Sequence, residues 1–264
     1  MAVDATRYWE DRHASEESLD TVGWAGLGRA FNGRMYDVRR HVFRRVVQAR
    51  VPLAADIKVL DIGSGTGFYL DIWSDLGVRR IEGSDLSQRA VERLRSAYPG
   101  TPIHQLDLGA DNPPTLGGYD VVSAMDVLFH IVDDDAYARA VVSLARLVVP
   151  GGHVVISENL LADRVERAPS QVSRSEAEIL ELLHGAGLQP VSRTPMFVLL
   201  NAPVDSSNVW LRRWWTLLTK AVSRNEAVGS ALGTVLWPVE LVALRLARRG
   251  PSTKLLVCRR IGPS

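Results

Sequence analysis

Glycines and acidic residues in the N-terminal half carry the clearest chemical pattern of this chain. An apolar run contains Asp61 near its end, and Gly63, Gly65 and Gly67 follow at alternate positions. Because glycine lacks a side chain and tolerates positive φ, such a turn lets a ligand approach the backbone closely. A second apolar run ends at Asp85, whose carboxylate could bind the two hydroxyls of a ribose. The pattern predicts a nucleoside-containing ligand at the ends of two neighbouring strands.

The glycine spacing distinguishes between ligands of this kind. A dinucleotide site has the pattern G-x-G-x-x-G over a pyrophosphate. Here the third glycine comes one position early, at Gly67, and Phe68 occupies the expected position. The spacing Asp-x-Gly-x-Gly-x-Gly resembles motif I of the class I S-adenosylmethionine-dependent methyltransferases, and the resemblance extends over residues 55–160. It implies an enzyme that uses S-adenosylmethionine as its cofactor.

The resemblance also implies roles for individual residues at the cofactor. Asp61 would orient the glycine turn and the methionine amino group, Asp85 would bind the ribose, and Asp107 would bind the adenine amino group. Any single aspartate here could instead cap a helix or form a turn, but three that end successive strands form a specific pattern. The expected cofactor-binding residues are Asp61, Gly63, Ser64, Gly65, Gly67, Asp85, Leu86, Asp107, Leu108 and Met125.

Catalytic or substrate groups are expected in the segment 125–135, because members of this family usually place such groups after the fourth strand. His130 lies there, and an imidazole can take a proton from an acceptor hydroxyl near neutral pH. The alternative is a histidine that only caps or packs. Tyr8 and Trp9, in the N-terminal segment, could close over the cofactor.

An acidic run, Asp133 to Asp135, raises the question of a metal site. The run precedes a predicted helix, where a side-chain cap and a favourable interaction with the helix dipole explain acidic residues. We therefore expect an N-terminal cap and no metal.

The elements that must position these residues alternate between strand and helix. Strands are predicted near residues 57–62, 80–85, 103–107, 119–125, 153–158, 191–200 and 253–259. Helices are predicted near residues 7–20, 34–50, 67–76, 87–97, 134–148 and 173–187. Repeated units of this length imply an α/β fold. We expect a Rossmann-like, doubly wound, mostly parallel seven-stranded sheet, with an N-terminal helical cap and a helical insertion before the last strand.

Three parts are predicted along the chain: a helical cap at 1–50, a methyltransferase domain at 51–203 and 251–264, and an insertion at 204–250. Family members usually join the last two strands by a short hairpin. We expect the insertion to be a helical substrate lid, with a peripheral contact to a membrane or a partner surface as alternatives. Its longest charge-free run, 227–239, is shorter than the roughly 18–20 residues of a spanning helix. No transmembrane span is expected.

Composition narrows the class of protein further. The chain has 264 residues, of which 46% are hydrophobic and 23% charged, as in an ordinary globular protein. The N-terminus is polar and acidic, which predicts no secretory signal. A lone cysteine, Cys258, cannot form an internal disulfide and excludes a paired-cysteine mechanism. These features predict a cytoplasmic location.

Charge is distributed unevenly although the formal net charge is +1. Residues 29–50 carry seven arginines against Asp37, and residues 201–264 carry ten lysines and arginines against three acidic residues. The remainder of the chain is therefore acidic. The basic segments could dock on this acidic core, or they could attract an anionic substrate or membrane surface. No nucleic-acid-binding module accompanies them, so a nucleic-acid partner is not expected.

The expected reaction is methylation of a small-molecule acceptor. A hydroxyl oxygen of a glycoside, polyketide or lipid-like compound is favoured, because His130 can act as a base and the insertion is rich in tryptophan. The nearest alternative is N-methylation of a small amine, whose lone pair can attack without a base. An RNA-modifying methyltransferase is the more distant alternative. The sequence indicates no oligomeric state.

Overall fold

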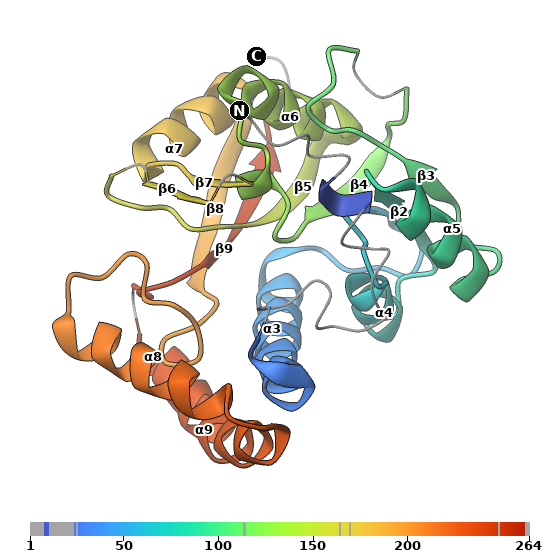
Figure 1. Cartoon of the computed structure of the whole chain (residues 1–264). Helices are drawn as coiled ribbons and strands as arrows, with labels where there is room; N and C mark the ends of the chain where they lie inside the picture. Colours follow the sequence, from blue (N-terminus) through green and yellow to red (C-terminus); the bar gives the residue numbers. More distant parts are fainter. Residues whose placement is uncertain are drawn as a thin grey trace.

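The computed structural model describes residues 8–10, 24, 26–112, 115–163, 165–168, 170–247 and 249–261 (Figure 1). Its main sheet contains β1 (Lys58–Ile62), β2 (Arg80–Asp85), β3 (Ile103–Gln105), β4 (Tyr119–Ala124), β5 (Val148–Glu158), β8 (Leu188–Pro195) and β9 (Lys254–Arg260). The helices are α3 (Gly28–Arg50), α4 (Phe68–Asp75), α5 (Gln88–Ala97), the 3-10 turn η1 (Leu128–His130), α6 (Asp134–Leu147), α7 (Glu176–Gly185), α8 (Val209–Val222) and α9 (Glu226–Leu246). A separate hairpin consists of β6 (Val165–Ala168) and β7 (Gln171–Ser173).

The strand order of the main sheet is β3-β2-β1-β4-β5-β9-β8. Strands β1 to β5 pair in parallel, whereas β9 pairs antiparallel with both β5 and β8. This arrangement confirms the predicted Rossmann-like, mostly parallel seven-stranded sheet. The order reverses between β1 and β4, which is where a doubly wound sheet opens a crevice at the carboxyl ends of its strands.

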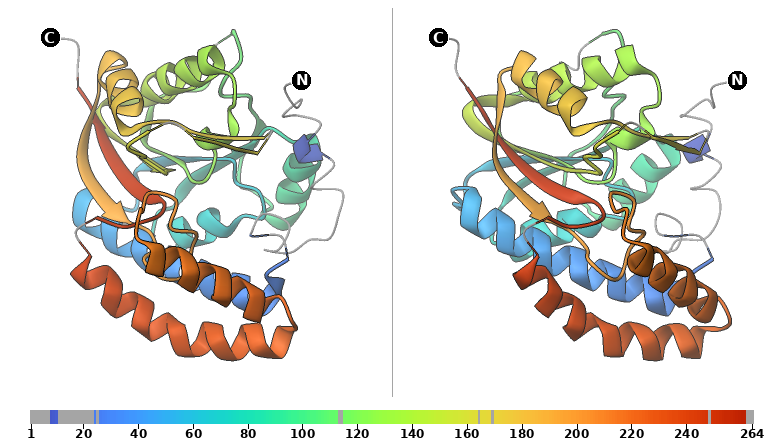
Figure 2. Two further views of the ribbon diagram at one scale, coloured as in Figure 1. Left: turned by 60° about the vertical axis from the view of Figure 1, so that its left-hand side comes forward. Right: turned by 90° about the vertical axis from the view of Figure 1, so that its left-hand side faces the viewer.

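Helices cover both faces of the sheet (Figure 2). Alternate residues of a strand point to opposite faces, and in β1 the neighbours Val59 and Leu60 belong to different cores. Val59 packs in a core that contains residues of α3 and α4, and Leu60 in one that contains residues of α6 and α7. Burial on both faces explains why these strands read as continuous apolar runs rather than alternating ones.

Several boundaries differ from the sequence prediction because tertiary pairing decides them. Strand β5 begins at Val148 rather than 153, since Val148 pairs with Tyr119 before a register shift in the ladder. Gly151 has a φ of +83° in this irregular stretch, so residues that indicated a turn lie inside an extended strand. Strand β3 ends at Gln105, two residues earlier than predicted. The β6–β7 hairpin was not predicted.

The insertion contains helices α8 and α9, which lie outside α3 at one end of the molecule (Figures 1 and 2). Helix α9 packs on α3, where a Cβ on Gly233 would lie 2.9 Å from Cγ of Arg34. The buried carboxylate of Glu240 accepts hydrogen bonds from the backbone N–H groups of Val198 (2.5 Å) and Leu199 (2.7 Å). These contacts fix α9 to both α3 and the segment that follows β8.

By length and composition alone, α9 is long and apolar enough to cross a membrane. The charge-free run in the sequence did not indicate this, because Glu226, Glu240 and Arg245 are few enough for the 21-residue helix to remain apolar overall. The expectation that the chain has no transmembrane span stays a prediction, because this property concerns length and composition only. In the structure 22% of the apolar stretch is buried, and further side chains, among them Leu236, Trp237 and Leu241, are partly buried against the core.

Candidate active site

The carboxyl ends of the parallel strands border a cavity of about 950 Å³. Its wall includes most residues that the sequence predicts for the site: Gly63, Ser64, Gly65, Asp85, Leu86, Asp107, Leu108, Met125 and His130. Asp61, inside β1, and Gly67, at the end of the glycine turn, do not form part of the wall. The structure thus brings together residues from β1, β2, β4 and the loop after β3.

The glycine turn adopts a backbone conformation that suits glycine at all three positions. Gly63, Gly65 and Gly67 have φ values of +69°, +54° and +88°. A Cβ on Gly63 would lie 2.4 Å from a methyl carbon of Val127. The turn is also anchored to β2, because the Ser64 N–H donates to the Ser84 carbonyl at 2.8 Å. The backbone atoms of the turn are therefore accessible to a ligand in the cavity.

Asp85 connects the glycine turn to the start of α5. One carboxylate oxygen accepts the N–H of Gly65 at 2.9 Å, and the other accepts the N–H of Ser87 at 3.0 Å. The side chain is buried, yet it lines the cavity. Because a carboxylate oxygen can accept more than one hydrogen bond, Asp85 keeps capacity for two ribose hydroxyls.

Asp61 is buried and only partly satisfied. Its Oδ1 accepts a hydrogen bond from the Ser123 hydroxyl at 2.6 Å, and the Ser123 oxygen accepts the indole N–H of Trp73 at 3.0 Å. Its Oδ2 is buried without a hydrogen-bond partner in the described part of the chain. Burial, with a smaller contribution from Asp85, raises the pKa of Asp61 to about 7. A cationic ligand beside it would stabilise the carboxylate.

Ser123 and Trp73 were missed by sequence reasoning, although one signal was present. Ser123 is a serine within the apolar run of β4, and the parallel register places it directly beside Asp61. A buried hydroxyl needs a partner. An isolated polar residue in a strand next to the glycine turn could therefore have been assigned to Asp61.

Asp107 holds the loop that follows β3. Its Oδ1 accepts the N–H of Gly109 at 2.9 Å, and the Gly109 carbonyl accepts from Arg139 at 2.9 Å. Asp107 and Leu108 both reach the cavity from this loop. Their position beyond the end of β3 agrees with a role at the base end of a bound nucleoside.

His130 ends η1 and reaches the cavity from the loop after β4. Its Nδ1 lies 3.0 Å from the Ser170 carbonyl oxygen, at the turn of the β6–β7 hairpin. A carbonyl only accepts, so Nδ1 carries the proton and Nε2 is the basic atom of the neutral ring. The ring of Trp9 packs edge-on against His130, with centroids 4.9 Å apart. This geometry suits a general base.

Arg39 and Asp126 form a polar pair in the cavity wall. Asp126 lies in the segment 125–135, where substrate groups were expected, whereas Arg39 was not predicted at the site. Arg39 donates to Asp126, and its guanidinium lies 5.2 Å from the centre of the Phe197 ring. Asp126 has a φ of +59°, an uncommon conformation for a residue other than glycine. Ser157 holds it there, accepting its N–H at 2.6 Å and donating to its Oδ1 at 2.8 Å. From the sequence, Arg39 was noted only as one of the arginines of the basic segment 29–50.

The insertion contributes to the cavity only through its flanks. The wall includes Asn201, Ala202 and Val204 before α8, and Ser252 and Thr253 after α9. No residue of 209–246, all of which the structure describes, lines the cavity. A role of the two helices as a substrate lid stays a prediction.

Acidic side chains near the cavity have structural partners rather than metal-site geometry. Asp133 caps α6 by accepting the N–H of Ala136 at 2.8 Å, as expected, and Asp134 pairs with Arg174. Among the described residues, no group of three or more His, Cys, Asp or Glu side chains could hold a metal ion.

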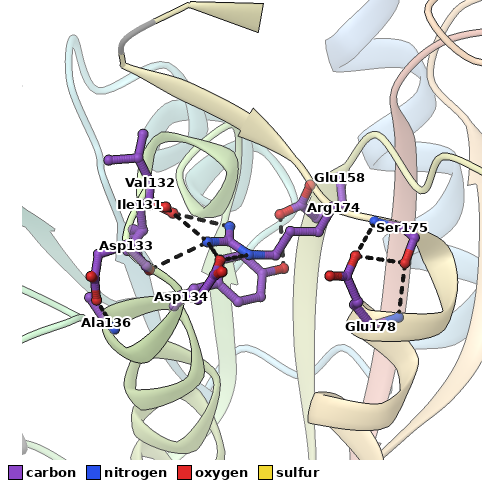
Figure 3. A network of polar contacts seen from close by, with 10 residues as sticks. Ile131, Val132, Asp133, Asp134, Ala136, Glu158, Arg174, Ser175 and Glu178 are labelled. Atoms are coloured by element: carbon purple, nitrogen blue, oxygen red, sulfur yellow. Dashed lines mark hydrogen bonds and ion pairs between the residues drawn. The ribbon is translucent and has the colours of Figure 1, made fainter. Parts of the chain in front are cut away.

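Arg174 holds the loop that carries His130 (Figure 3). It donates to the Ile131 carbonyl at 3.0 Å and to the Asp134 carboxylate at 2.7 Å, and its guanidinium lies 3.8 Å from the centre of the Tyr137 ring. The Tyr137 hydroxyl in turn donates to Glu158 at 3.1 Å. Burial raises the pKa of Glu158 to about 7.

We expect Arg174→Ala to lower the free energy of unfolding by about 2 kcal/mol, because it removes a buried guanidinium that donates to the Ile131 carbonyl and packs on the Tyr137 ring. Urea unfolding followed by tryptophan fluorescence would measure the change. Arg193→Ala is the matched control, since Arg193 pairs with Glu176 at the surface and such pairs contribute little. Equal losses for the two variants would contradict a special role of Arg174.

Known proteins resemble the chain in sequence. A family model described as a methyltransferase domain matches residues 36–219. A ubiquinone biosynthesis O-methyltransferase from Thiobacillus denitrificans is 38% identical over 120 residues, which cover 43% of this chain and 48% of that protein. A tRNA U34 carboxymethyltransferase from Shewanella sp. is 37% identical over 78 residues, covering 27% and 23%. The chain thus spans about half the length, or less, of the curated relatives it matches.

Solved structures share the fold at low sequence identity. Magnesium protoporphyrin IX methyltransferase from Synechocystis PCC 6803, solved with bound S-adenosylmethionine, has a TM-score of 0.56 and 17% identity over 98% of each chain. A methyltransferase from Leishmania major has a TM-score of 0.58 and 18% identity, covering 74% of this chain and 75% of that one. At these identities the likeness concerns the fold.

Proposed function

Because the chain belongs to the class I S-adenosylmethionine-dependent methyltransferase family, we propose that it methylates a hydroxyl oxygen of a lipid-like or aromatic small molecule. The observation that carries this proposal is His130, whose Nε2 is the basic ring nitrogen in the cavity that also contains the glycine turn. The O-methyltransferase relatives support a hydroxyl acceptor.

The residues at the strand ends fit S-adenosylmethionine, which supplies a methyl group on a positively charged sulfur. Asp85 would accept the ribose hydroxyls while keeping its bonds to the glycine turn. Asp107 and Leu108 would hold the adenine. The buried, unpartnered Oδ2 of Asp61 fits a nearby cationic group, because an unsatisfied buried acceptor is costly.

The remaining wall of the cavity suits an acceptor with an apolar or aromatic body. Tyr36, Phe68 and Trp9 contribute aromatic surface, and Arg39 with Asp126 provides a polar end. Methyl transfer requires the acceptor oxygen in line with the methyl–sulfur bond, so a shaped wall contributes by positioning. His130 would take the hydroxyl proton at Nε2 as the oxygen attacks.

Methyl-labelled cofactor and a panel of acceptors would test this function. The panel contains a prenylated catechol, a simple catechol, a glycoside and a primary amine. We expect label transfer to a hydroxyl compound, with the prenylated catechol as the best acceptor. Transfer to the amine alone would contradict O-methylation and favour the N-methyltransferase alternative.

Cofactor affinity is expected to rise as the pH increases from about 5.5 to 7. The raised pKa of Asp61, about 7, means that this carboxyl is largely protonated at the acidic end. A bound cation favours the carboxylate, so binding releases protons in this range, while an ordinary α-amino group, with a pKa of about 7.7–8.0, stays charged. Calorimetry in two buffers of different ionisation enthalpy would measure the protons released. Asp61→Asn should bind more weakly and lose this pH dependence; an unchanged pH dependence in that variant would contradict the assignment.

A further inference from the structure

Helix α9 presents an apolar stripe on the side opposite its packed face. Four exposed side chains follow one another at spacings of four, three and four residues, which places them on one face of the helix. They are Val235 (66% exposed), Val239 (47%), Val242 (55%) and Leu246 (79%). The buried residues of α9 are Gly229, Gly233, Glu240 and Leu244, which lie on the other side and include the contacts to α3. The outer stripe contains no charged residue.

Helix α8 presents a different outer face, in which apolar and basic side chains alternate. Trp210, Arg213, Leu217 and Lys220 follow at spacings of three and four residues and therefore lie on one side. Trp210 is 75% exposed and Leu217 is 67% exposed, and the Arg213 guanidinium lies 5.6 Å from the centre of the Trp210 ring. The buried residues of α8, Leu218 and Val222, are on the opposite side.

Acidic side chains of the insertion are engaged within the protein. Asp205 pairs with Lys254, Glu226 accepts the N–H groups of Arg29 (2.8 Å) and Ala30 (3.0 Å), and Glu240 is buried against the segment after β8. Exposed basic residues remain on and beside the two helices: Arg212, Arg213, Lys220, Arg224, Arg245 and Arg249. The outer surface of the insertion therefore combines apolar side chains with excess positive charge.

From this combination we infer that the outer faces of α8 and α9 form a docking surface for an anionic phospholipid bilayer. Tryptophan and leucine would enter the interfacial region, while arginine and lysine would reach the phosphate groups beside them. Each basic residue near an anionic leaflet adds attraction that salt screens. The inference rests on the two helices alone and does not depend on the acceptor proposed above.

Contacts of α9 favour this surface mode of binding over a membrane span. To cross a bilayer, α9 would have to leave α3 and separate Glu240 from the two backbone N–H groups that it binds.

A second copy of this chain fits the surface less well than an anionic bilayer does. Its α8 face carries the same arginines and lysines, so like charges would oppose each other in a symmetric contact.

Vesicle co-sedimentation of the full chain would test the docking surface. We expect binding to vesicles of phosphatidylcholine mixed with phosphatidylglycerol, little binding to phosphatidylcholine alone, and release at high salt. The double variant Arg213→Glu with Lys220→Glu should bind at least ~10-fold more weakly, because each reversal removes an attraction and adds a repulsion. Trp210→Ser with Leu217→Ser should bind more weakly at every salt concentration.

Matched controls separate the surface from general charge and from folding. Arg79→Glu with Arg80→Glu reverses two exposed basic residues at the start of β2, which three strands separate from β9, and should bind vesicles as the wild type does. All variants should retain wild-type urea unfolding and cofactor binding. Equal loss in this control pair would overturn the proposal.

Other occupants of the surface give distinct results. Binding that resists high salt and carbonate extraction would indicate a spanning helix and overturn the surface mode. Concentration-dependent dimers in analytical ultracentrifugation that Val239→Asp abolishes, without vesicle binding by the wild type, would show that a second copy covers the stripe. Failure of vesicle binding leaves methyl transfer unaffected, so the two proposals can fail separately.

Discussion

Asp85→Ala is expected to weaken the binding of S-adenosylmethionine by at least ~100-fold. A hydrogen bond to a charged group contributes about 1.5–3 kcal/mol, and Asp85 would receive two from the ribose hydroxyls. About 3 kcal/mol corresponds to a factor of about 100 in the dissociation constant. The substitution also removes the acceptor of the Gly65 N–H, so the glycine turn loses its attachment at 2.9 Å. Titration calorimetry with the cofactor and with its demethylated product would measure both affinities.

Two further variants make the Asp85 result specific. Glu92→Ala removes a nearby acid on the exposed side of α5, where Glu92 accepts from Gln88, and should leave the affinity unchanged. Asp85→Asn keeps one acceptor oxygen and the volume of the side chain, so its affinity should fall between wild type and Asp85→Ala. Binding by Asp85→Ala within a few-fold of wild type, with intact folding, would remove the ribose from the role assigned to this carboxylate.

Local sequence determines the part of the site that could be predicted. Short apolar runs predict the strands, and the glycine turn, Asp61 and Asp85 lie at or near their ends. Parallel pairing brings these ends together. The backbone of the turn requires glycine at each position, so spacing alone carries the geometry. This part of the structure depends on few contacts between distant segments. The mostly parallel sheet follows from the alternation of strands and helices along the chain.

Contacts between distant segments decide the part that could not be predicted. The partner of Arg39 is Asp126, 87 positions away, and the partner of His130 Nδ1 is the carbonyl of Ser170 in an unpredicted hairpin. Every residue type has a backbone carbonyl, so the sequence cannot indicate which ring nitrogen of His130 carries the proton. The insertion shows the same limit: its helical character can be read from composition, but its packing through Glu240 requires the fold.

The hairpin links fold to chemistry because it determines the basic atom of His130. Arg174 follows β7 directly and donates to the Ile131 carbonyl at 3.0 Å. Ser170, at the turn of the same hairpin, accepts the Nδ1 proton of His130 with its carbonyl oxygen. One element therefore holds both the loop and the ring. A catalytic base needs such support, since its lone pair must point at the acceptor proton when the methyl group is in place.

His130→Ala is accordingly expected to lower kcat by about 10²–10⁴-fold, the range that general base catalysis contributes. The dissociation constant of the cofactor should stay within a few-fold of wild type, because the strand-end residues that would bind it are unchanged. Steady-state kinetics with the best acceptor from the panel would measure kcat and KM separately.

His184→Ala is the matched control for this substitution, because His184 lies exposed in the last turn of α7 and should be replaced without effect on the rate. His130→Gln keeps a polar side chain without a comparable base, so it should be as slow as His130→Ala if proton removal is the missing step. Recovery of activity in His130→Gln would instead assign His130 to positioning the acceptor. A kcat for His130→Ala within a few-fold of wild type would contradict the base role. If the acceptor in that experiment is a primary amine, an unchanged kcat would mean that the nitrogen lone pair attacks without a base.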